Sequence, residues 1–253
     1  MKVTMSHSGR TVDSFEALLS RYSKAEFASP RRSTVPLLAY WHDAERQVHA
    51  FSASAGIPLS GSVGLDFEHK VPVQRGSGKP SCTDLMILAE RTAVALEAKF
   101  TESRYDDVRA WLGLPAKQNR VDVLNGWLDL IGKSVGRRLD IDHVLDLPYQ
   151  LVHRAASACR PDAESHWLVY QVFDATPEKR CMYLDDLKRL ASIIGEANGL
   201  RYCMVECALK RSDHYRELEA LWDSGHRDLR DRVTAGLKAG SLLEVQLSNV
   251  VAF

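Results

Sequence analysis

The chain has 253 residues, of which 45% are hydrophobic, and its 33 basic side chains equal its 33 acidic side chains in number. The length allows one large core or two small ones, and the neutral balance excludes a strongly basic nucleic-acid binder, so any surface for nucleic acid has to be a local patch. Five cysteines without a C-x-x-C pair predict reduced thiols in the cytoplasm, and the lack of an apolar run of ~20 residues predicts no membrane segment.

The N-terminal part, residues 1–60, is expected to be helical after a loose polar stretch at residues 1–12. A short helix begins near Ser14, and one longer helix follows Arg32, because apolar residues recur there at helical spacing. The longer helix is expected to end before Gly56. Its apolar stripe indicates a packing element rather than a catalytic one.

Gly61–Val73 predicts the first core strand, in which Asp66, Glu68 and Lys70 alternate along the chain. Glu68 and Lys70 form an E-x-K triplet, but no acidic strand precedes it, since residues 52–63 contain no Asp or Glu. Glu68 is therefore either an additional carboxylate of a site on neighbouring strands or an exposed glutamate on an edge strand.

The sequence QRGSGKP at residues 74–80 predicts a flexible loop that looks at first like a phosphate-binding loop. That pattern fails because Val73 stands where its first glycine is required, and Pro80 stands where Ser or Thr must follow the lysine. The loop leads directly into the next strand, so its two cations, Arg75 and Lys79, are expected near whatever site that strand carries.

Two apolar runs, Cys82–Leu88 and Thr92–Phe100, flank a polar break at residues 89–91. Both runs are too short for a typical helix, so they predict an antiparallel hairpin at the buried centre of a sheet. A turn centred on the break pairs residues whose numbers sum to 181, which sets Asp84 opposite Glu97.

Glu97 and Lys99 are two residues apart and therefore share one face of their strand. Facing carboxylates of Asp84 and Glu97 repel each other unless a divalent cation lies between them, and buried charges are costly unless they are paired or bound to a metal. The cluster predicts a site for a hard cation, to which the carbonyl of Ala98 can contribute. The alternative is a structural ion pair between Glu97 and Lys99.

The dipeptide TD that ends at Asp84 and the triplet EAK at Glu97–Lys99 resemble the motifs of the PD-(D/E)XK nuclease superfamily, although the proline directly before Asp84 is missing. The stretch EAKFTE and a following YQL helix are similar to bacterial sequences described as restriction endonucleases. The resemblance extends from Glu68 to Phe173. It implies an α/β fold with a restriction-endonuclease-like core, in which helices flank a mixed central sheet.

The resemblance also implies a Mg²⁺ site, for which Mn²⁺ can substitute. The ligands it implies are Asp84, Glu97, the Ala98 carbonyl and, as an addition, Glu68. Lys99 would orient or deprotonate the attacking water, or stabilise the charged phosphate. Glu102 is either a partner of Lys99 or a further ligand.

Residues beyond the hairpin are expected to complete the site. Nucleases of this group often place a glutamine of the helix after the lysine strand at the active site, which points to Gln150, although the alternative is an ordinary polar residue at a helix start. Arg154 lies one turn further on the same face and is expected to bind a phosphate. Arg75 and Lys79 are expected to hold the DNA backbone.

The remaining elements predict the rest of one domain spanning residues 1–253, with a core at 61–210 and a C-terminal extension at 211–253. The predicted helices are Lys117–Ile131, which ends at Gly132, a helix opened by Leu147, and Leu184–Ile194. The predicted strands are His166–Phe173 and Arg201–Leu209. The apolar tail at 242–253 is either a last strand or a dimer contact.

We therefore expect a Mg²⁺-dependent DNA endonuclease of bacterial restriction or defence, and a homodimer if both strands of a duplex are cut. The first alternative is a catalytically inactive member of the same fold that binds nucleic acid or acts as a scaffold. The second is an unrelated α/β protein in which Glu97 and Lys99 form a structural pair.

Overall fold

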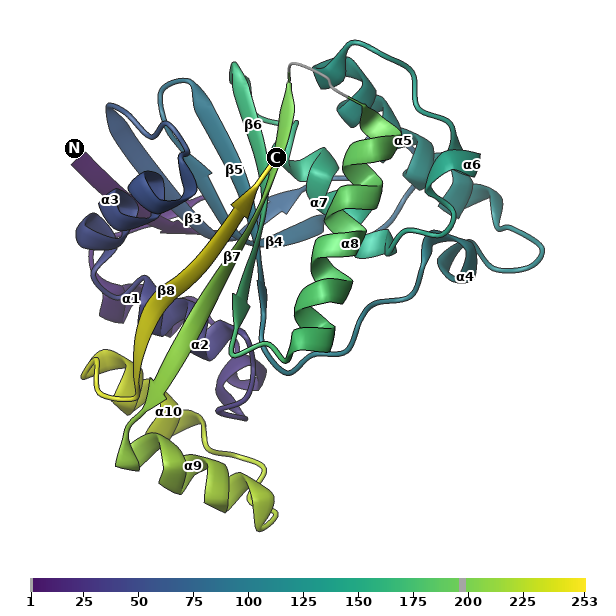
Figure 1. Cartoon of the computed structure of the whole chain (residues 1–253). Coiled ribbons are helices and arrows are strands. Elements are labelled where there is room, and N and C mark those ends of the chain that lie inside the picture. Colours follow the sequence, from purple (N-terminus) through teal and green to yellow (C-terminus); the bar gives the residue numbers. More distant parts are fainter. Residues whose placement is uncertain (1, 196–198) are drawn as a thin grey trace.

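The computed structural model describes residues 2–195 and 199–253, which form an eight-stranded mixed sheet with helices on both faces (Figure 1). The strands lie in the order β2-β1-β3-β4-β5-β6-β7-β8. Their bounds are β1 Lys2–His7, β2 Arg10–Val12, β3 Ser62–Val71, β4 Ser81–Leu88, β5 Thr92–Lys99, β6 Ser165–Phe173, β7 Leu200–Arg211 and β8 Leu243–Ala252. The helices are α1 Phe15–Arg21, η1 Lys24–Phe27, α2 Thr34–Tyr40, α3 Ala44–Ala55, α4 Val108–Leu112, α5 Gln118–Val135, α6 Ile141–Val144, α7 Tyr149–Ala158, α8 Pro177–Ile194, α9 Asp213–Asp223 and α10 Arg230–Lys238. The predicted α/β fold with a mixed central sheet is thus confirmed.

Two hydrophobic layers hold the helices against the sheet, one on each face. On one face the N-terminal helices and α10 pack through residues such as Leu38 and Phe51 against Leu96 of β5. On the other face α5, α7 and α8 pack through residues such as Leu151 against Ala95 of the same strand. β5 is buried at all eight of its positions, as expected of a central strand covered on both sides. No helix in the described ranges is long and apolar enough to span a bilayer.

The predicted hairpin at the centre of the sheet is confirmed together with its register. β4 and β5 are antiparallel, and Leu85 pairs with Leu96 while Leu88 pairs with Ala93, so the paired numbers sum to 181. β6 and β7 then continue the sheet in parallel with β5. The strand that carries Glu97 and Lys99 therefore has a paired neighbour on each side.

The expectation that residues 1–12 are loose is wrong. Residues 2–12 form β1, β2 and the turn between them, and β1 runs parallel to β3 on the side away from β4. Asp66 of β3 fixes the turn between them, because its carboxylate accepts hydrogen bonds from Ser6 Oγ at 2.7 Å and from the Gly9 amide at 2.9 Å. The sequence signal for this strand is a polar–apolar alternation, in which Val3 packs against the core.

The single longer helix expected after Arg32 is in fact two helices. α2 ends at Tyr40, and the Asp43 side chain then accepts a hydrogen bond from the Arg46 amide at 3.3 Å and starts α3. α3 ends at Gly56 as predicted, where φ is 64°. An aspartate with the geometry of a helix cap thus overrides a continuous apolar stripe.

The helix predicted to end at Gly132 continues to Val135, and Gly136, with φ of 72°, ends it instead. Glycine is required at position 132 because of a close approach and not as a helix end. A Cβ there would lie 2.5 Å from the carbonyl oxygen of Arg137, so only glycine allows the chain to return this closely. α8 likewise begins earlier than expected, at Pro177, because Thr176 caps it.

The C-terminal tail forms β8, which pairs antiparallel with β7. Together with β1, it carries the sheet beyond the predicted core of residues 61–210 on both sides. All five cysteines are free thiols, as the sequence predicts. The two long strands β7 and β8 extend past the rest of the sheet towards α9 and α10 (Figure 1).

Candidate active site

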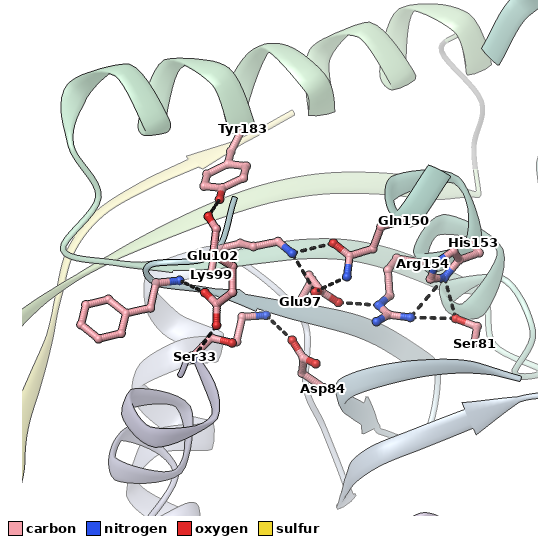
Figure 2. A network of polar contacts seen from close by, with 12 residues as sticks. Ser33, Ser81, Asp84, Glu97, Lys99, Glu102, Gln150, His153, Arg154 and Tyr183 are labelled. Atoms are coloured by element: carbon pink, nitrogen blue, oxygen red, sulfur yellow. Dashed lines mark hydrogen bonds and ion pairs between the residues drawn. The ribbon is translucent and has the colours of Figure 1, made fainter. Parts of the chain in front are cut away.

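The candidate site lies where β4 and β5 separate. Their paired part ends at Leu85 and Leu96, and beyond it the Asp84 carboxylate replaces a backbone acceptor: Oδ2 accepts a hydrogen bond from the Ala98 amide at 2.7 Å (Figure 2). This bond places Asp84 beside the Glu97–Lys99 segment. The Ala98 group that reaches Asp84 is its N–H, and the expected role of its carbonyl as a metal ligand stays a prediction.

Glu97 is the centre of a buried polar network (Figure 2). Its Oε1 accepts hydrogen bonds from Lys99 Nζ at 2.9 Å and Gln150 Nε2 at 2.8 Å, and its Oε2 accepts from the Arg154 guanidinium. Lys99 Nζ also donates to Gln150 Oε1 at 2.5 Å. We call these four residues the Glu97 cluster, and none of them is more than 6% exposed. The structure thus brings together four side chains that the sequence analysis had singled out, including Gln150.

The two elements of the Glu97 cluster explain its geometry. Glu97 and Lys99 alternate with Leu96 and Ala98, which face the other layer, so both point to the face that α7 covers. α7 presents Gln150 and Arg154 one turn apart on its buried side. The periodicity of the strand and that of the helix therefore bring these four side chains together between β5 and α7.

Arg154 is held from two directions. Its Nη1 donates to Ser81 Oγ at 2.9 Å and lies 3.1 Å from Nδ1 of its neighbour His153, while Nε faces Glu97. Ser157 Oγ donates in turn to Ser81 Oγ at 3.0 Å. The guanidinium that we expected to bind a phosphate thus takes part in a buried ion pair, which fixes its position at the side of the site.

The Glu97 cluster holds two cations and one carboxylate, and these charges decide the direction of the pKa shifts within it. Burial by itself would raise the pKa of Glu97, but the charges of Arg154 and Lys99 outweigh it and lower that pKa below its ordinary value. Burial would lower the pKa of Lys99, but the carboxylates of Glu97 and Asp84 raise it. Burial and the charges of Arg154 and Lys99 hold the pKa of His153 well below its usual range. Lys99 is therefore an ammonium and His153 a neutral imidazole at neutral pH.

A second group of side chains lies on the β3–β4 side, and we call Asp84, Glu68 and Cys82 the Asp84 cluster. Cys82 Sγ donates to Glu68 Oε2 at 3.0 Å. Glu68 lies opposite Asp84, between the pairs Phe67–Leu85 and His69–Thr83 of β3 and β4. Its φ of 53° is a conformation that costs free energy in a residue other than glycine and is often found at functional sites. β3 is an interior strand, since β1 lies beyond it, so the edge-strand interpretation of Glu68 is wrong.

Negative charge is in excess in the Asp84 cluster. Burial and the charge of Glu97 raise the pKa of Asp84 well above its ordinary value, despite the opposing effects of Arg154 and Lys99. Burial also raises the pKa of Glu68, and the charges of Glu26 and Glu97 raise it further. Burial and the charge of Glu68 raise the pKa of the Cys82 thiol to about 12, so this thiol is not a nucleophile.

A buried hydroxyl adjoins the Asp84 cluster. Tyr22 is 4% exposed, and its hydroxyl has no hydrogen-bond partner among the described residues. Burial raises the pKa of Tyr22, and the charges of Glu68 and Asp84 raise it further. An unpartnered polar group at this place is one that a water or the hydration shell of an ion would satisfy.

Glu102 accepts two hydrogen bonds that neither expectation included, and its expected role as a further ligand stays a prediction. Its Oε1 accepts from the Ser33 amide at 2.7 Å and its Oε2 from the Phe100 amide at 2.9 Å (Figure 2). It thus ties the end of β5 to the start of α2, and no contact among the described residues joins it to Lys99.

A pocket of about 750 Å³ opens beside the Glu97 cluster, between the 73–82 loop, α5 and α7. Gln150, Arg154 and Lys79 line it. Arg75, the other cation of the loop, does not line it and instead pairs with Asp129 of α5 at 2.5 Å. Of the two loop cations that the sequence singled out, one therefore lies at the pocket and one on the outer surface of α5.

Two residues at the site were missed by sequence reasoning. Tyr105 lies with its ring centroid 4.9 Å from Lys99 Nζ, and His153 lies against Arg154. His153 directly precedes Arg154 on the same helix. Its place next to a residue that we had singled out was therefore a sequence signal that it lies near the site. Nothing in the sequence around Tyr105 indicates that the loop after β5 folds back over Lys99.

The acceptor capacity of the site fits a divalent cation. In the described part of the chain, no three His, Cys, Asp or Glu side chains are grouped closely enough to hold a metal by themselves. Within the same residues, Glu97 Oε2 accepts only from Arg154 and no hydrogen bond reaches Asp84 Oδ1, so both oxygens keep free lone pairs. Mg²⁺ is commonly held by one or two carboxylates, with water and substrate phosphate as its other ligands.

The comparisons with known proteins concern the family rather than the chemistry. No curated protein and no solved structure matches the chain. A family model described as a domain of unknown function, DUF6946, matches residues 10–212, which include both clusters of the site and the strands β2 to β7. Because the match covers most of the chain, the protein belongs to the DUF6946 family.

Proposed function

We propose that the protein is a Mg²⁺-dependent endonuclease of the PD-(D/E)XK type that hydrolyses phosphodiester bonds of DNA, with Mn²⁺ as a substitute ion. The observation that carries the proposal is the contrast within one site: a buried ammonium, Lys99, is fixed by Glu97 and Gln150, and an uncompensated carboxylate, Asp84, lies beside them where two strands separate. Resemblance of the TD and EAK segments to that superfamily adds support.

The proposed metal ligands are Asp84 and Glu97, through Oδ1 and Oε2, with Glu68 as an additional carboxylate in the neighbourhood. A bound divalent cation supplies Lewis acidity that lowers the pKa of an attacking water and offsets charge on the phosphate. The excess of negative charge in the Asp84 cluster is what such an ion would balance.

The role of Lys99 follows from its protonation and its contacts. Two of its three N–H groups are directed to Glu97 Oε1 and Gln150 Oε1, which leaves one for a substrate. Because neighbouring carboxylates raise its pKa, Lys99 is a donor to a phosphate oxygen or to the attacking water rather than a base. Gln150 acts as a positioning residue, since it contacts both Lys99 and Glu97.

The proposed setting is bacterial restriction or defence in the cytoplasm, where the five free thiols are stable. Cutting of both strands of a duplex would require a homodimer, since residues 2–195 and 199–253 form one such site.

A second candidate function is a protein that binds nucleic acid or serves as a scaffold without cutting. One observation favours it: Lys99 and Arg154 already neutralise Glu97 in the absence of any ion. The two candidates differ in whether the ion binds and whether the strand breaks.

Incubation of plasmid and of circular single-stranded DNA with Mg²⁺ or Mn²⁺ tests the proposal. We expect nicking by the wild type and a loss of at least about a hundredfold in Asp84→Asn and Lys99→Met, the scale on which removal of such groups slows catalysis. Lys70→Met is the matched control, because Lys70 is the exposed lysine of the other E-x-K triplet. Thermal unfolding with and without Mn²⁺ gives a second readout: an ion should raise the Tm of the wild type and not that of Asp84→Asn. Cleavage unchanged in both variants contradicts the assigned roles, and a Mn²⁺ shift without cleavage favours the second candidate.

A further inference from the structure

The pocket beside the Glu97 cluster has a composition that the proposed phosphodiester chemistry alone does not require. Its volume of about 750 Å³ lies within the usual range of small-molecule sites. Its floor includes Gln150 and Arg154, both of which contact Glu97. A molecule in this pocket would therefore lie next to the proposed reacting centre.

The charge of the pocket wall is one-sided. Lys79, Arg120 and Arg154 line it, and none of the described residues that line it is Asp or Glu. The chain as a whole has as many acidic as basic side chains, so this separation is a local feature. A wall of this kind attracts anions.

Aromatic side chains share the wall with these cations. Trp111 and Tyr149 are stacked with ring centroids 3.7 Å apart and planes 8° from parallel, and the Arg120 guanidinium lies 5.5 Å from the Trp111 ring. Tyr105 is 53% exposed at the mouth, with Lys99 beneath its ring. Contact with these rings does not favour binding of an inorganic anion, whereas a planar base stacks on them.

We propose that this pocket binds one unpaired nucleotide, with its base against the exposed ring of Tyr105 and the neighbouring aromatic wall and its phosphate near Lys79 and Arg154. Resting on the proposed function, this assignment places the adjoining phosphodiester at Asp84, Glu97 and Lys99. A base within a continuous duplex cannot enter a concave pocket without leaving its stack. The substrate class is therefore single-stranded nucleic acid, or a duplex with an unpaired end or gap, rather than an intact duplex.

Binding in EDTA separates this inference from catalysis. The probes are a fluorescein-labelled dA12, the same strand in a 12-base-pair duplex, free dAMP and inorganic phosphate, with anisotropy and tryptophan fluorescence as readouts, since Trp111 and Trp127 line the pocket. We expect dA12 to bind at least tenfold more tightly than the duplex and to quench tryptophan fluorescence. Phosphate should not displace it.

The variants are Tyr105→Ala and Lys79→Ala, both at exposed positions where folding is not at stake. Tyr105→Ala should weaken dA12 binding about fivefold or more, the lower end of what the loss of one base–aromatic stack costs. Lys79→Ala should weaken it and reduce its salt dependence. Phe253→Ala and Lys133→Ala are matched controls, an exposed aromatic and an exposed lysine away from the pocket, and should leave binding unchanged.

Each outcome decides the question. Equal affinity for dA12 and duplex, or dA12 binding unaffected by Tyr105→Ala, overturns the inference even if the protein still cleaves DNA. Quenching of tryptophan fluorescence by dAMP in a protein that does not bind dA12 assigns the pocket to a free nucleotide and overturns the strand assignment. Selective dA12 binding that is lost in Tyr105→Ala supports the pocket even if plasmid cleavage fails, in which case the proposed function falls and the nucleotide site remains.

Discussion

The two clusters of the candidate site are neighbours with opposite electrostatic designs. In the Glu97 cluster a carboxylate, an ammonium and a guanidinium are paired at hydrogen-bond distance, and an amide satisfies the remaining groups. In the Asp84 cluster two carboxylates share a thiol and a backbone amide as their donors. The pKa of Glu97 is lowered and that of Asp84 is raised, although the two strands that carry them are adjacent.

This difference separates what the fold needs from what a ligand would need. A buried ion pair whose members are all satisfied is complete by itself, and removal of one member leaves an unpaired charge. A carboxylate with a raised pKa is a cost to the folded state at neutral pH that an added cation would offset. Substitutions in the two clusters should therefore change stability in opposite directions.

The largest effect is expected from Glu97→Gln. It leaves Lys99 and Arg154 buried without a counter-charge and should lower the free energy of unfolding by about 3–5 kcal/mol. Because the pKa of Glu97 is lowered in the folded state, its contribution is present above the ordinary value of 4.5 and is lost as the pH falls through the lowered folded pKa. Urea denaturation at pH 7 measures the effect, with the exposed Glu90→Gln as control.

If Glu97→Gln proves as stable as the control, the ion pairs of the Glu97 cluster contribute nothing to the stability of the fold. The contrast drawn between the two clusters would then be wrong. Thermal unfolding of the wild type at decreasing pH gives an independent check, since the loss of stability should set in below pH 4.5.

An effect of opposite sign is expected from Asp84→Asn in metal-free buffer. Asparagine keeps an acceptor for the Ala98 amide and removes the uncompensated charge, so the free energy of unfolding should rise by about 1–3 kcal/mol. The Tm would rise by about 2–4 °C for each kcal/mol. The gain should be full above the raised folded pKa of Asp84 and vanish as the pH falls towards its ordinary value of 3.8.

Calorimetry of wild type and Asp84→Asn between pH 4 and pH 8 in EDTA measures this difference. A lower Tm for Asp84→Asn at pH 7 would mean that the carboxylate is already balanced, which would remove the electrostatic reason for an ion at this site.

The smallest effect is expected from Glu68→Gln, because the Cys82 thiol and Arg154 already favour the ionised form in part. A gain of at most about 1 kcal/mol is expected at pH 7, with the same sign and pH dependence as that of Asp84→Asn. In the double variant with Asp84→Asn the gain should be smaller than the sum of the two, since each substitution relieves the repulsion felt by the other residue. Additive gains would show that the charges of Glu68 and Asp84 do not interact.

The sequence predicted the centre of the fold and of the site because both rest on periodicity. The register that brings Asp84 to Glu97 follows from the length of one turn, and the spacing of one helix places Arg154 on the same face as Gln150. Gln150 itself was chosen from the resemblance to the nuclease family. The N-terminal strands were missed because their apolar residues are few, and β3 supplies the pairing that makes them strands. Long-range pairing of this kind leaves little local signal.

The same limit applies within the site. The ion pair of Arg154 with Glu97 depends on the distance between α7 and β5, which no spacing along the chain gives. The positive φ of Glu68 and the fold of the loop that carries Tyr105 likewise depend on contacts with distant segments. Local chemistry selected the participants, and tertiary packing decided their partners.

The strands β1 and β8 have a practical consequence for work on this family. The family match covers residues 10–212, whereas β1 and β8 lie outside it and pair with β3 and β7. A recombinant fragment cut at those boundaries would expose the edges of β3 and β7 that β1 and β8 cover. Each exposed edge could pair with a strand of another copy. Insolubility of such a trimmed fragment would reflect the missing flanks and not the intrinsic behaviour of the domain.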